Sequence, residues 1–372
     1  MCDAFGVVVF AGNHVHVDGL EDYRSIGALS FLGRYRVIDF PISNMTNSGI
    51  DNIQMYVKSH PRSVIDHVGT GRHYNINSKR GKLSVLFGDQ SQSTSSFYRH
   101  DIASFYYNRL AIEAMPQKYV VIASNYMLYS IDYNDVVEQH IESGADITMI
   151  YKSVDTAKDE FINCDTLNLN KQKGVLSIET NRGNYKTRNI SLESYVMSKE
   201  IFLAMIDQAV NTSSLYWMKD ILNDSCKFLD VRGYQYKGYL AAINSFNAYY
   251  KANMELLNPT ERKKLFKEDW PIYTKTNDSA PTHYFKNGSA TGSLVSNGCC
   301  VEGRIEHSVI GRGCHIKEGA LVKNCVLAPG TIIGEDVVIE NVVVDKKVVI
   351  SQVKEVKGTE EKPAYVKRND RI

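Results

Sequence analysis

The stretch GRYRVIDFPISNMTNSGI, residues Gly33–Ile50, decides the fold of this chain. It opens with alternating basic and aromatic residues, continues through an apolar run and breaks at Pro41. Ser43 or Asn44 can cap a short helix after the break, because either side chain can accept a hydrogen bond from a free backbone N–H. A second apolar segment, residues 52–57, follows almost directly. The pattern predicts a loop, a helix and a strand within an α/β sheet.

Strand and helix signals alternate on both sides of this stretch. Short apolar runs predict strands at residues 6–10, 52–57, 119–123, 146–151, 228–231 and 236–240. Helices are predicted at residues 61–69, 104–114, 134–143, 199–210, 216–222 and, with Ser245 as cap, to Asn253. A serine-rich loop is expected at 89–96 and a β-rich segment at 161–196. This alternation is typical of a doubly wound, Rossmann-like α/β domain, expected over residues 1–256.

The C-terminal part has a different pattern. Residues 257–287 have no clear period and are interpreted as a linker. From residue 288 apolar residues recur every five or six positions, at Val295, Val301, Ile305, Ile310, Ile316, Val322, Leu327, Ile333 and Ile339. Hexapeptide periodicity favours a left-handed parallel β-helix over 288–353 against a set of ordinary short strands. The charged residues 354–372 are predicted to be a frayed tail.

Composition excludes several classes of protein. The chain has 372 residues, 43% hydrophobic and 23% charged, and these values fit a globular protein of two domains. A net charge of +1 gives no electrostatic reason to expect nucleic acid or membrane partners. No apolar run approaches the roughly 20 residues of a membrane span, and the N-terminus has no signal-peptide pattern. Seven cysteines without CxxC spacing indicate reduced thiols in a cytoplasmic protein.

The stretch Gly33–Ile50 closely resembles the GKYRLIDFPLSNCxNSGI segment of ADP-glucose pyrophosphorylases. These enzymes make the glucosyl donor for bacterial glycogen and plant starch. The resemblance extends from about residue 6 to about residue 350. The family joins a nucleotidyltransferase domain to a C-terminal left-handed β-helix, so the resemblance implies the architecture that the patterns predict.

The resemblance implies a phosphate loop after the first strand, AGGxGTRLxPLTxxRAKPAV in the family, and this chain departs from it. Only the opening Ala-Gly and a few later residues match. The family arginine falls at His16 or Val17, and the lysine of RAKP falls at Ile26. Without the glycines and these cations, the loop is not expected to hold a triphosphate.

Two metal-binding carboxylates that the resemblance implies are also replaced. The family sequence YVVILAGDHIYKxDY aligns with residues 119–133, and its metal-binding aspartate becomes Tyr126. The family sequence GYWRDVGTxxAYWxAN aligns with residues 238–253, and its aspartate becomes Ala242. The sugar-facing SxMGIY motif has become Ser191–Tyr195. The chain therefore resembles the noncatalytic, regulatory subunit of the family, with no cofactor of its own and Mg²⁺ only on a catalytic partner.

Arg34 and Arg36 are the remaining candidates for ligand binding. They alternate along an extended segment and are expected to point to the same side, where they could bind an anion. In the family the corresponding region contributes to a cleft between the two domains that accepts phosphorylated regulators. Two solvated arginines, or ion pairs with the β-helix, are the open alternative. The implied partner is a catalytic subunit, in a hetero- or homotetramer.

Other functions remain to be weighed against this one. An active nucleotidyltransferase with a rebuilt site would need two convergent carboxylates near the strand ends, and the sequence shows none. A scaffold without any ligand is the simplest alternative. A β-helix acyltransferase is disfavoured, because His307 and His315 fit outward-facing turn positions.

Overall fold

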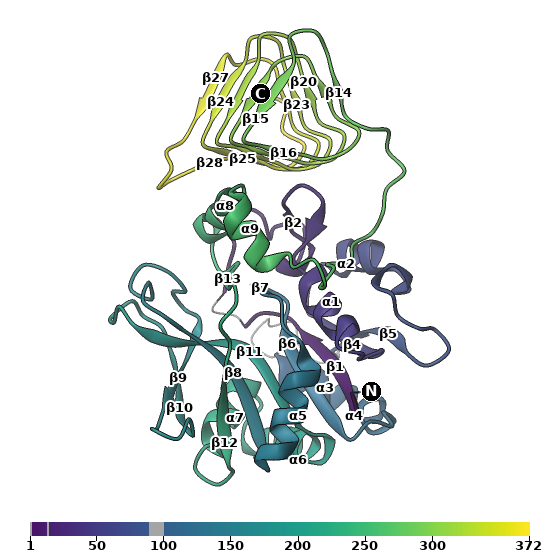
Figure 1. Ribbon diagram of the computed structural model, residues 1–372, viewed down its shortest axis with the longest axis vertical. Coiled ribbons are helices and arrows are strands. Elements are labelled where there is room, and N and C mark those ends of the chain that lie inside the picture. Colours follow the sequence, from purple (N-terminus) through teal and green to yellow (C-terminus); the bar gives the residue numbers. More distant parts are fainter. Residues whose placement is uncertain (1, 13–14, 89–99) are drawn as a thin grey trace.

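The computed structural model describes residues 2–12, 15–88 and 100–372, and consists of an α/β domain and a β-helix domain (Figure 1). The predicted loop at 89–96 lies outside the described residues. Both predicted architectures are confirmed, because a mixed sheet flanked by helices is followed by stacked parallel coils. Within the described ranges no helix is long and apolar enough to cross a bilayer.

Strand β1 lies at the centre of the large sheet, which has nine strands in the described part of the chain. The order is β10-β9-β11-β6-β1-β4-β5, with β8 paired to β11 and β12. The strands are β1 Ala4–Val9, β4 Asn52–Val57, β5 Lys82–Phe87, β6 Tyr119–Ser124, β8 Ile147–Val154, β9 Asp165–Leu169, β10 Val175–Thr180, β11 Arg188–Ser198 and β12 Val231–Gln235. Strands β6, β1, β4 and β5 run parallel, and β11 runs antiparallel to β6. Buried parallel strands of this kind explain the continuous apolar runs.

Helices lie on both faces of the sheet, and the last two helices of this domain lie between the sheet and the β-helix (Figure 1). They are α1 Asp39–Asn47, α2 Pro61–Val68, α3 Asp101–Tyr107, α4 Arg109–Glu113, α5 Tyr133–Ser143, α6 Lys199–Thr212, α7 Met218–Ser225, α8 Phe246–Glu255 and α9 Pro259–Leu265. The predicted cap of α8 is confirmed, because the Ser245 hydroxyl accepts a hydrogen bond from Ala248 N at 3.1 Å. Helix α9 lies inside the predicted linker, which is therefore partly helical.

Helix α1 begins earlier than the sequence predicts. It starts at Asp39, so that Pro41 lies in the first turn, where its missing N–H has no intrahelical partner to lose. Ser43 and Asn44 therefore lie within the helix and are buried, and neither is the cap. Instead the Asn44 amide donates to the carbonyl of Tyr129 at 2.9 Å and ties α1 to the segment after β6.

Two further predictions are corrected. The predicted helix 104–114 is divided at Asn108, whose side-chain amide donates to the carbonyls of Phe87 and Ser104. The predicted strands 228–231 and 236–240 are replaced by the single strand β12. In both places the side-chain and sheet contacts of the folded domain override a local pattern.

The C-terminal domain is a left-handed β-helix of three parallel sheets, seen as stacked coils in Figure 1. Its strands are β14 His283–Tyr284, β15 Ser289–Thr291, β16 Leu294–Val295, β17 Cys300–Val301, β18 Arg304–Glu306, β19 Val309–Ile310, β20 His315–Ile316, β21 Leu321–Lys323, β22 Val326–Leu327, β23 Ile332–Ile333, β24 Val338–Glu340, β25 Val342–Val344, β26 Val349–Ile350, β27 Glu355–Lys357 and β28 Ala364–Val366. The six predicted inward residues are each at most 1% exposed: Ile310, Ile316, Val322, Leu327, Ile333 and Ile339. The inward assignment is confirmed.

The predicted charged tail is instead the last coil of the β-helix. Strands β27 and β28 pair in parallel with β24 and β25. Val366 is 5% exposed and belongs to the aliphatic core, while Glu355 and Lys357 are exposed. The charges on the outer positions conceal an inward apolar pattern, which is why composition alone predicts fraying.

The opening stretch contacts the β-helix through a hairpin of β2 Ser30–Phe31 and β3 Tyr35–Arg36. Gly33 at its tip has φ of 70°, and a Cβ there would lie 2.6 Å from the carbonyl oxygen of Ile310. Only glycine accommodates this backbone and this approach. The hairpin is also held by α8, since Leu32 N donates to Asn253 Oδ1 at 2.9 Å.

A buried ion pair joins the two domains at a second point. Arg24 Nη2 donates to both carboxylate oxygens of Asp345, at 2.7 and 2.6 Å, and the two residues are 4% and 0% exposed. The Tyr365 hydroxyl lies 3.1 Å from the same carboxylate and 3.1 Å from the carbonyl oxygen of Gly19, and it can donate its one hydrogen to either. The segment that follows β1 is therefore fixed to the last coils of the β-helix.

We expect the substitution Ile333→Lys to destabilise the β-helix by several kcal/mol, because it buries an ammonium group without a partner. Thermal unfolding followed by circular dichroism measures the effect. The matched control is Ile332→Lys, since Ile332 lies next to Ile333 on β23 but is only partly buried. Equal melting temperatures for the wild type and Ile333→Lys would contradict the inward assignment.

Candidate functional site

The two positions that the resemblance assigns to metal-binding aspartates lie side by side. Tyr126 follows β6, and the short strand β7, Met127–Leu128, pairs with β13, Ala241–Ala242. Ala242 is opposite Met127, and Ile243 N donates to the carbonyl of Tyr126 at 2.8 Å. Tyr126 is 0% and Ala242 6% exposed. The fold thus brings these positions together, but they carry a phenol and a methyl group.

The Tyr126 hydroxyl donates a hydrogen bond to the carboxyl group of Glu193, which comes from the irregular part of β11. Glu193 has φ of 46°, an unusual backbone conformation for a residue other than glycine. Burial, with the neighbouring charge of Asp165, raises the pKa of the Glu193 carboxyl to about 8. Glu193 is therefore mostly protonated at neutral pH and is paired with the residue that replaces the family aspartate.

Glu193 lines a cavity of about 570 Å³ together with three further acids, Asp165, Asp101 and Asp220. Asp165 on β9 pairs with Lys219, and its pKa is also raised by burial. Asp101 at the start of α3 accepts hydrogen bonds from Ile102 N at 2.7 Å and Met218 N at 3.0 Å. Burial raises the pKa of Asp101 to about 7.

The convergent carboxyl groups of Glu193, Asp165 and Asp101 correct the sequence analysis, which found none. They escaped it because they come from β11, β9 and α3, which are far apart in the chain. A divalent cation requires ionised carboxylates, whereas burial favours the protonated acids here. Among the residues that the structure describes, no three His, Cys, Asp or Glu side chains are placed to hold a metal ion. These residues do not fit Mg²⁺.

The segment that replaces the phosphate loop is folded onto itself where it is described. Val17 is fully buried, and its N–H donates to Glu21 Oε2 at 2.6 Å. Ile26 is 4% exposed in a single 3₁₀ turn and lines a cavity of about 160 Å³ beside Val15. His16 has a side chain that is 68% exposed. The two family cations have three candidate positions, because the arginine falls at His16 or Val17 and the lysine at Ile26. These positions carry one exposed imidazole and two buried apolar side chains.

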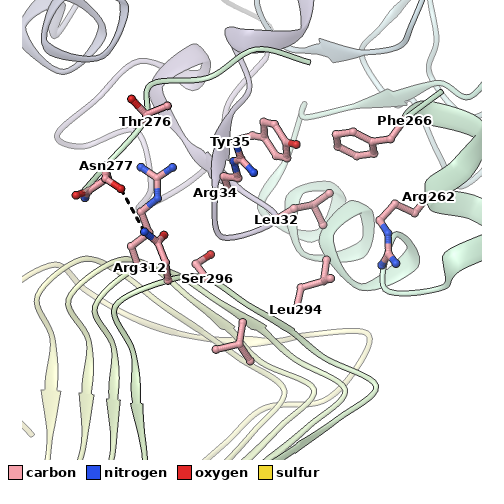
Figure 2. Close-up of a pocket in the computed structure, with 12 residues that line it drawn as sticks. Leu32, Arg34, Tyr35, Arg262, Phe266, Thr276, Asn277, Leu294, Ser296 and Arg312 are labelled. Atoms are coloured by element: carbon pink, nitrogen blue, oxygen red, sulfur yellow. Dashed lines mark hydrogen bonds between the residues drawn. The ribbon is translucent and has the colours of Figure 1, made fainter. Parts of the chain in front are cut away.

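A concave region of the described structure lies between the two domains, and we call it the interdomain cleft. It consists of two adjoining cavities of about 650 and 530 Å³, and Arg34, Tyr35 and Arg312 line both. Figure 2 shows Arg34 and Tyr35 on the hairpin facing the coil edge that carries Arg312, while Arg262 and Phe266 come from α9 and its end. The cleft therefore combines guanidinium groups with aromatic walls.

The smaller cavity is strongly cationic. Besides Arg34 and Arg312, it is lined by Arg36, Lys275 and Lys346, and a single acid, Asp278, lines it among the described residues. A concentration of cations in a partly closed cleft raises the local concentration of anions. The arrangement can bind a ligand that carries phosphate or carboxylate groups.

Arg36 is held in place by neighbouring backbone and side-chain groups. Its backbone N–H donates to Asp39 Oδ2 at 2.8 Å, and its guanidinium group donates to the backbone carbonyl of Ser63. The buried carboxylate of Asp39 also accepts from the Tyr74 hydroxyl and contacts His67 Nε2, both at 2.6 Å. Holding the arginine in one orientation lowers the entropy that a bound anion must remove.

The structure brings Arg34 and Arg36 to one cavity, and anion binding by them stays a prediction. Sequence reasoning missed Arg312 and Lys346, which lie in coil turns, because only the docking of the two domains places them near the hairpin. His307 lies in the turn between β18 and β19, as predicted, where it is exposed and contacts Asn324 Oδ1 at 3.0 Å. His315 is partly exposed but lies on strand β20 and not in a turn.

We expect the substitution Glu193→Gln to stabilise the chain at pH 8 relative to the wild type. The folded-state pKa of Glu193, about 8, lies above the ordinary value of 4.5, so ionisation disfavours the folded state. The destabilisation of the wild type by ionised Glu193 is absent at low pH. It grows as pH rises from 4.5 to about 8 and then levels off. Melting temperatures of both proteins at pH 5 to 9 should diverge over this window. The exposed Glu142→Gln serves as control, and parallel curves for Glu193→Gln would contradict the prediction.

Comparison with known families gives two matches along the chain. The nucleotidyl transferase family matches residues 23–161. The family described as GlmU-like, C-terminal hexapeptide, matches residues 280–364. The first match lies within the α/β domain and covers part of its sheet, and the second covers most of the β-helix.

Curated relatives cover most of the chain. The glycogen biosynthesis protein GlgD of Geobacillus stearothermophilus is 32% identical over 82% of this chain and 80% of the relative. The protein of the same name from Bacillus subtilis is 30% identical over 94% of this chain and 91% of the relative. The glucose-1-phosphate adenylyltransferase of Clostridium perfringens strain 13 is 29% identical over 82% of this chain and 78% of the relative. The chain belongs to the ADP-glucose pyrophosphorylase family, which includes these glucose-1-phosphate adenylyltransferases and glycogen biosynthesis proteins.

Proposed function

We propose that this chain is a catalytically deficient, regulatory subunit of ADP-glucose pyrophosphorylase in glycogen biosynthesis. It assembles with a catalytic homologue and changes the activity of that partner. The observation that carries the proposal is the pair Tyr126 and Ala242, which lie side by side where the family resemblance implies two metal-binding carboxylates. A buried phenol and a methyl group cannot hold Mg²⁺, so Mg²⁺ chemistry is left to the partner.

Two observations away from this site support the role and its compartment. The chain is similar both to proteins named for glycogen biosynthesis and to named adenylyltransferases, as expected for a related but distinct subunit. All seven cysteines are free, which suits the reducing cytoplasm in which we place the protein.

A second candidate function is an active nucleotidyltransferase with a rebuilt site. The convergent acids Glu193, Asp165 and Asp101 favour it, because catalysis of this kind needs several carboxylates. Two observations speak against it. Glu193 accepts a hydrogen bond from Tyr126, and Asp165 forms an ion pair with Lys219. Burial also raises the pKa of all three acids. We therefore prefer the noncatalytic role, with a pure scaffold as its simplest form.

The β-helix offers a surface for assembly. Strand β14 lies at the edge of its sheet in the described part of the chain. Tyr284 in this strand and Phe285 directly after it are 44% and 45% exposed. An open strand edge with exposed aromatic side chains is a suitable contact for another subunit. We propose a tetramer with two subunits of each kind, and a homotetramer as the alternative. Preferential contact with the active form of the partner would shift its equilibrium toward activity.

The interdomain cleft is the proposed place of regulation. Arg34 and Arg36, with the other cations of the smaller cavity, provide donors for a phosphorylated metabolite. A ligand there would contact both domains at once, so that its binding energy depends on their relative placement. This gives the subunit a means to transmit the presence of a metabolite to its partner.

The direct test is pyrophosphate release from ATP and glucose 1-phosphate by three preparations: this chain, a catalytic glucose-1-phosphate adenylyltransferase, and the two co-expressed. We expect no release above the blank from this chain, and a mixed complex whose rate differs from that of the partner alone. Restoring acids with Tyr126→Asp and Ala242→Asp should not create activity, because the loop still lacks its cations. Mg²⁺-dependent turnover that copurifies with this chain, or no mixed complex at micromolar concentration, would contradict the proposal.

The same complex tests the cleft. Arg34→Ala and Arg36→Ala should each weaken the response to phosphorylated metabolites about tenfold or more, by removing a charged hydrogen-bond donor. Assembly should be unaffected. Arg62→Ala is the matched control, because Arg62 has a side chain that is 95% exposed and lies outside the cleft lining. An unchanged metabolite response in both cleft variants would remove the cleft from the proposal.

A further inference from the structure

Lys346 lies in the wall of the interdomain cleft, directly after the acid of the buried ion pair. It lines the smaller cavity together with Arg34, Arg36 and Arg312, and its backbone N–H donates to Asp345 Oδ1 at 2.6 Å. Its position in the turn between β25 and β26 is fixed by the β-helix. The ammonium group is thus held among other cations.

The charges around Lys346 are mostly of its own sign. Arg24, Arg36 and Arg368 act on it from the α/β domain and from the last coil, and Asp345 is the acid that acts on it. Asp345 is already engaged, because both of its carboxylate oxygens contact Arg24 and one lies 3.1 Å from the Tyr365 hydroxyl. Burial is the main cause that lowers the pKa of Lys346 to about 7, and the positive charges of Arg36 and Arg24 lower it further.

Other titratable and charged groups of the cleft come from the α/β domain and from the segment before the β-helix. Burial lowers the pKa of His67 from 6.5, so this imidazole is mostly neutral above pH 7. Its acid partner, Asp39, is hydrogen-bonded to His67, Tyr74 and the backbone N–H of Arg36. Lys275 and Asp278 complete the charged lining and are exposed. Lys346 is the group in this lining whose charge changes between pH 7 and 8.

We propose that anion binding in the interdomain cleft is coupled to protonation of Lys346, so that the cleft takes up a proton together with its anion. This inference rests on the proposed anion site and names the way in which pH regulates it. The negative charge of Asp345 is already paired with Arg24. A bound anion brings a further negative charge close to Lys346 and therefore favours the protonated lysine. By linkage, protonation of Lys346 strengthens anion binding to the same extent.

The size of the effect follows from the fraction of protonated lysine. With a pKa of about 7 in the free protein, that fraction is about one half at pH 7 and about one tenth at pH 8. Anion affinity should therefore fall about fivefold from pH 7 to pH 8. Inorganic sulfate is the suitable probe, because its own charge does not change in this range, whereas that of a phosphate monoester does.

The test is isothermal titration calorimetry of the full chain with sulfate at pH 7 and pH 8. We expect about fivefold weaker binding at pH 8, and uptake of about half a proton per sulfate at pH 7, measured in buffers that differ in ionisation enthalpy. Lys346→Met should bind sulfate weakly and with no dependence on pH. Lys347→Gln, at the exposed neighbouring position, should keep the dependence of the wild type.

The outcomes separate the coupling from the site on which it rests. Equal affinity at the two pH values, or the same pH dependence in Lys346→Met, would overturn the coupling and leave the anion site in place. No binding of sulfate at either pH would overturn the anion site itself and the coupling with it. The proton-uptake measurement needs no variant, so it decides the question even if Lys346→Met fails to fold.

Discussion

The buried ion pair between Arg24 and Asp345 is the contact on which the arrangement of the molecule depends. It links the segment after the first strand to the last coils of the β-helix, across 321 residues of sequence. Removing one partner of such a pair leaves a buried, uncompensated charge, which typically costs about 3 to 5 kcal/mol. Because the pair fixes one domain against the other, it also determines the shape of the cleft. Arg36 and Lys346 line this cleft, and Lys346 lies within electrostatic reach of both members of the pair.

Electrostatics distinguishes the two concave regions of this protein. In the cavity near Tyr126, burial raises the pKa of the acids Glu193, Asp165 and Asp101. Glu193 is paired with the Tyr126 phenol, and Asp165 is paired with Lys219. The lysine in the described lining of this cavity, Lys219, is already paired with Asp165. In the interdomain cleft the excess charge is positive and partly exposed to solvent. The proposed loss of catalytic chemistry is compatible with a cationic cleft suited to small anions.

Much of the fold could be predicted from sequence, because periodic patterns report burial directly. The inward column from Ile310 to Ile339 and the parallel strands around β1 are examples. The sequence predicts that helix α1 begins after Pro41, whereas it begins at Asp39, because the first turn of a helix tolerates proline. The last coil was missed because its outward positions are charged. The convergence of Glu193, Asp165 and Asp101, and of Lys346 with the hairpin arginines, depends on tertiary packing and has no local signal.

The central claim is that ligand recognition belongs to the interdomain cleft and not to the former nucleotide site. Hydrogen–deuterium exchange of the purified chain, with sulfate or with ATP and Mg²⁺, tests it most directly. We predict that sulfate slows exchange at residues 30–36, 310–313 and 345–347, which surround the cleft. We predict no effect of ATP and Mg²⁺ at residues 15–26 and 119–127. Protection of these last two segments by ATP and Mg²⁺, without protection of the cleft by sulfate, would contradict the claim.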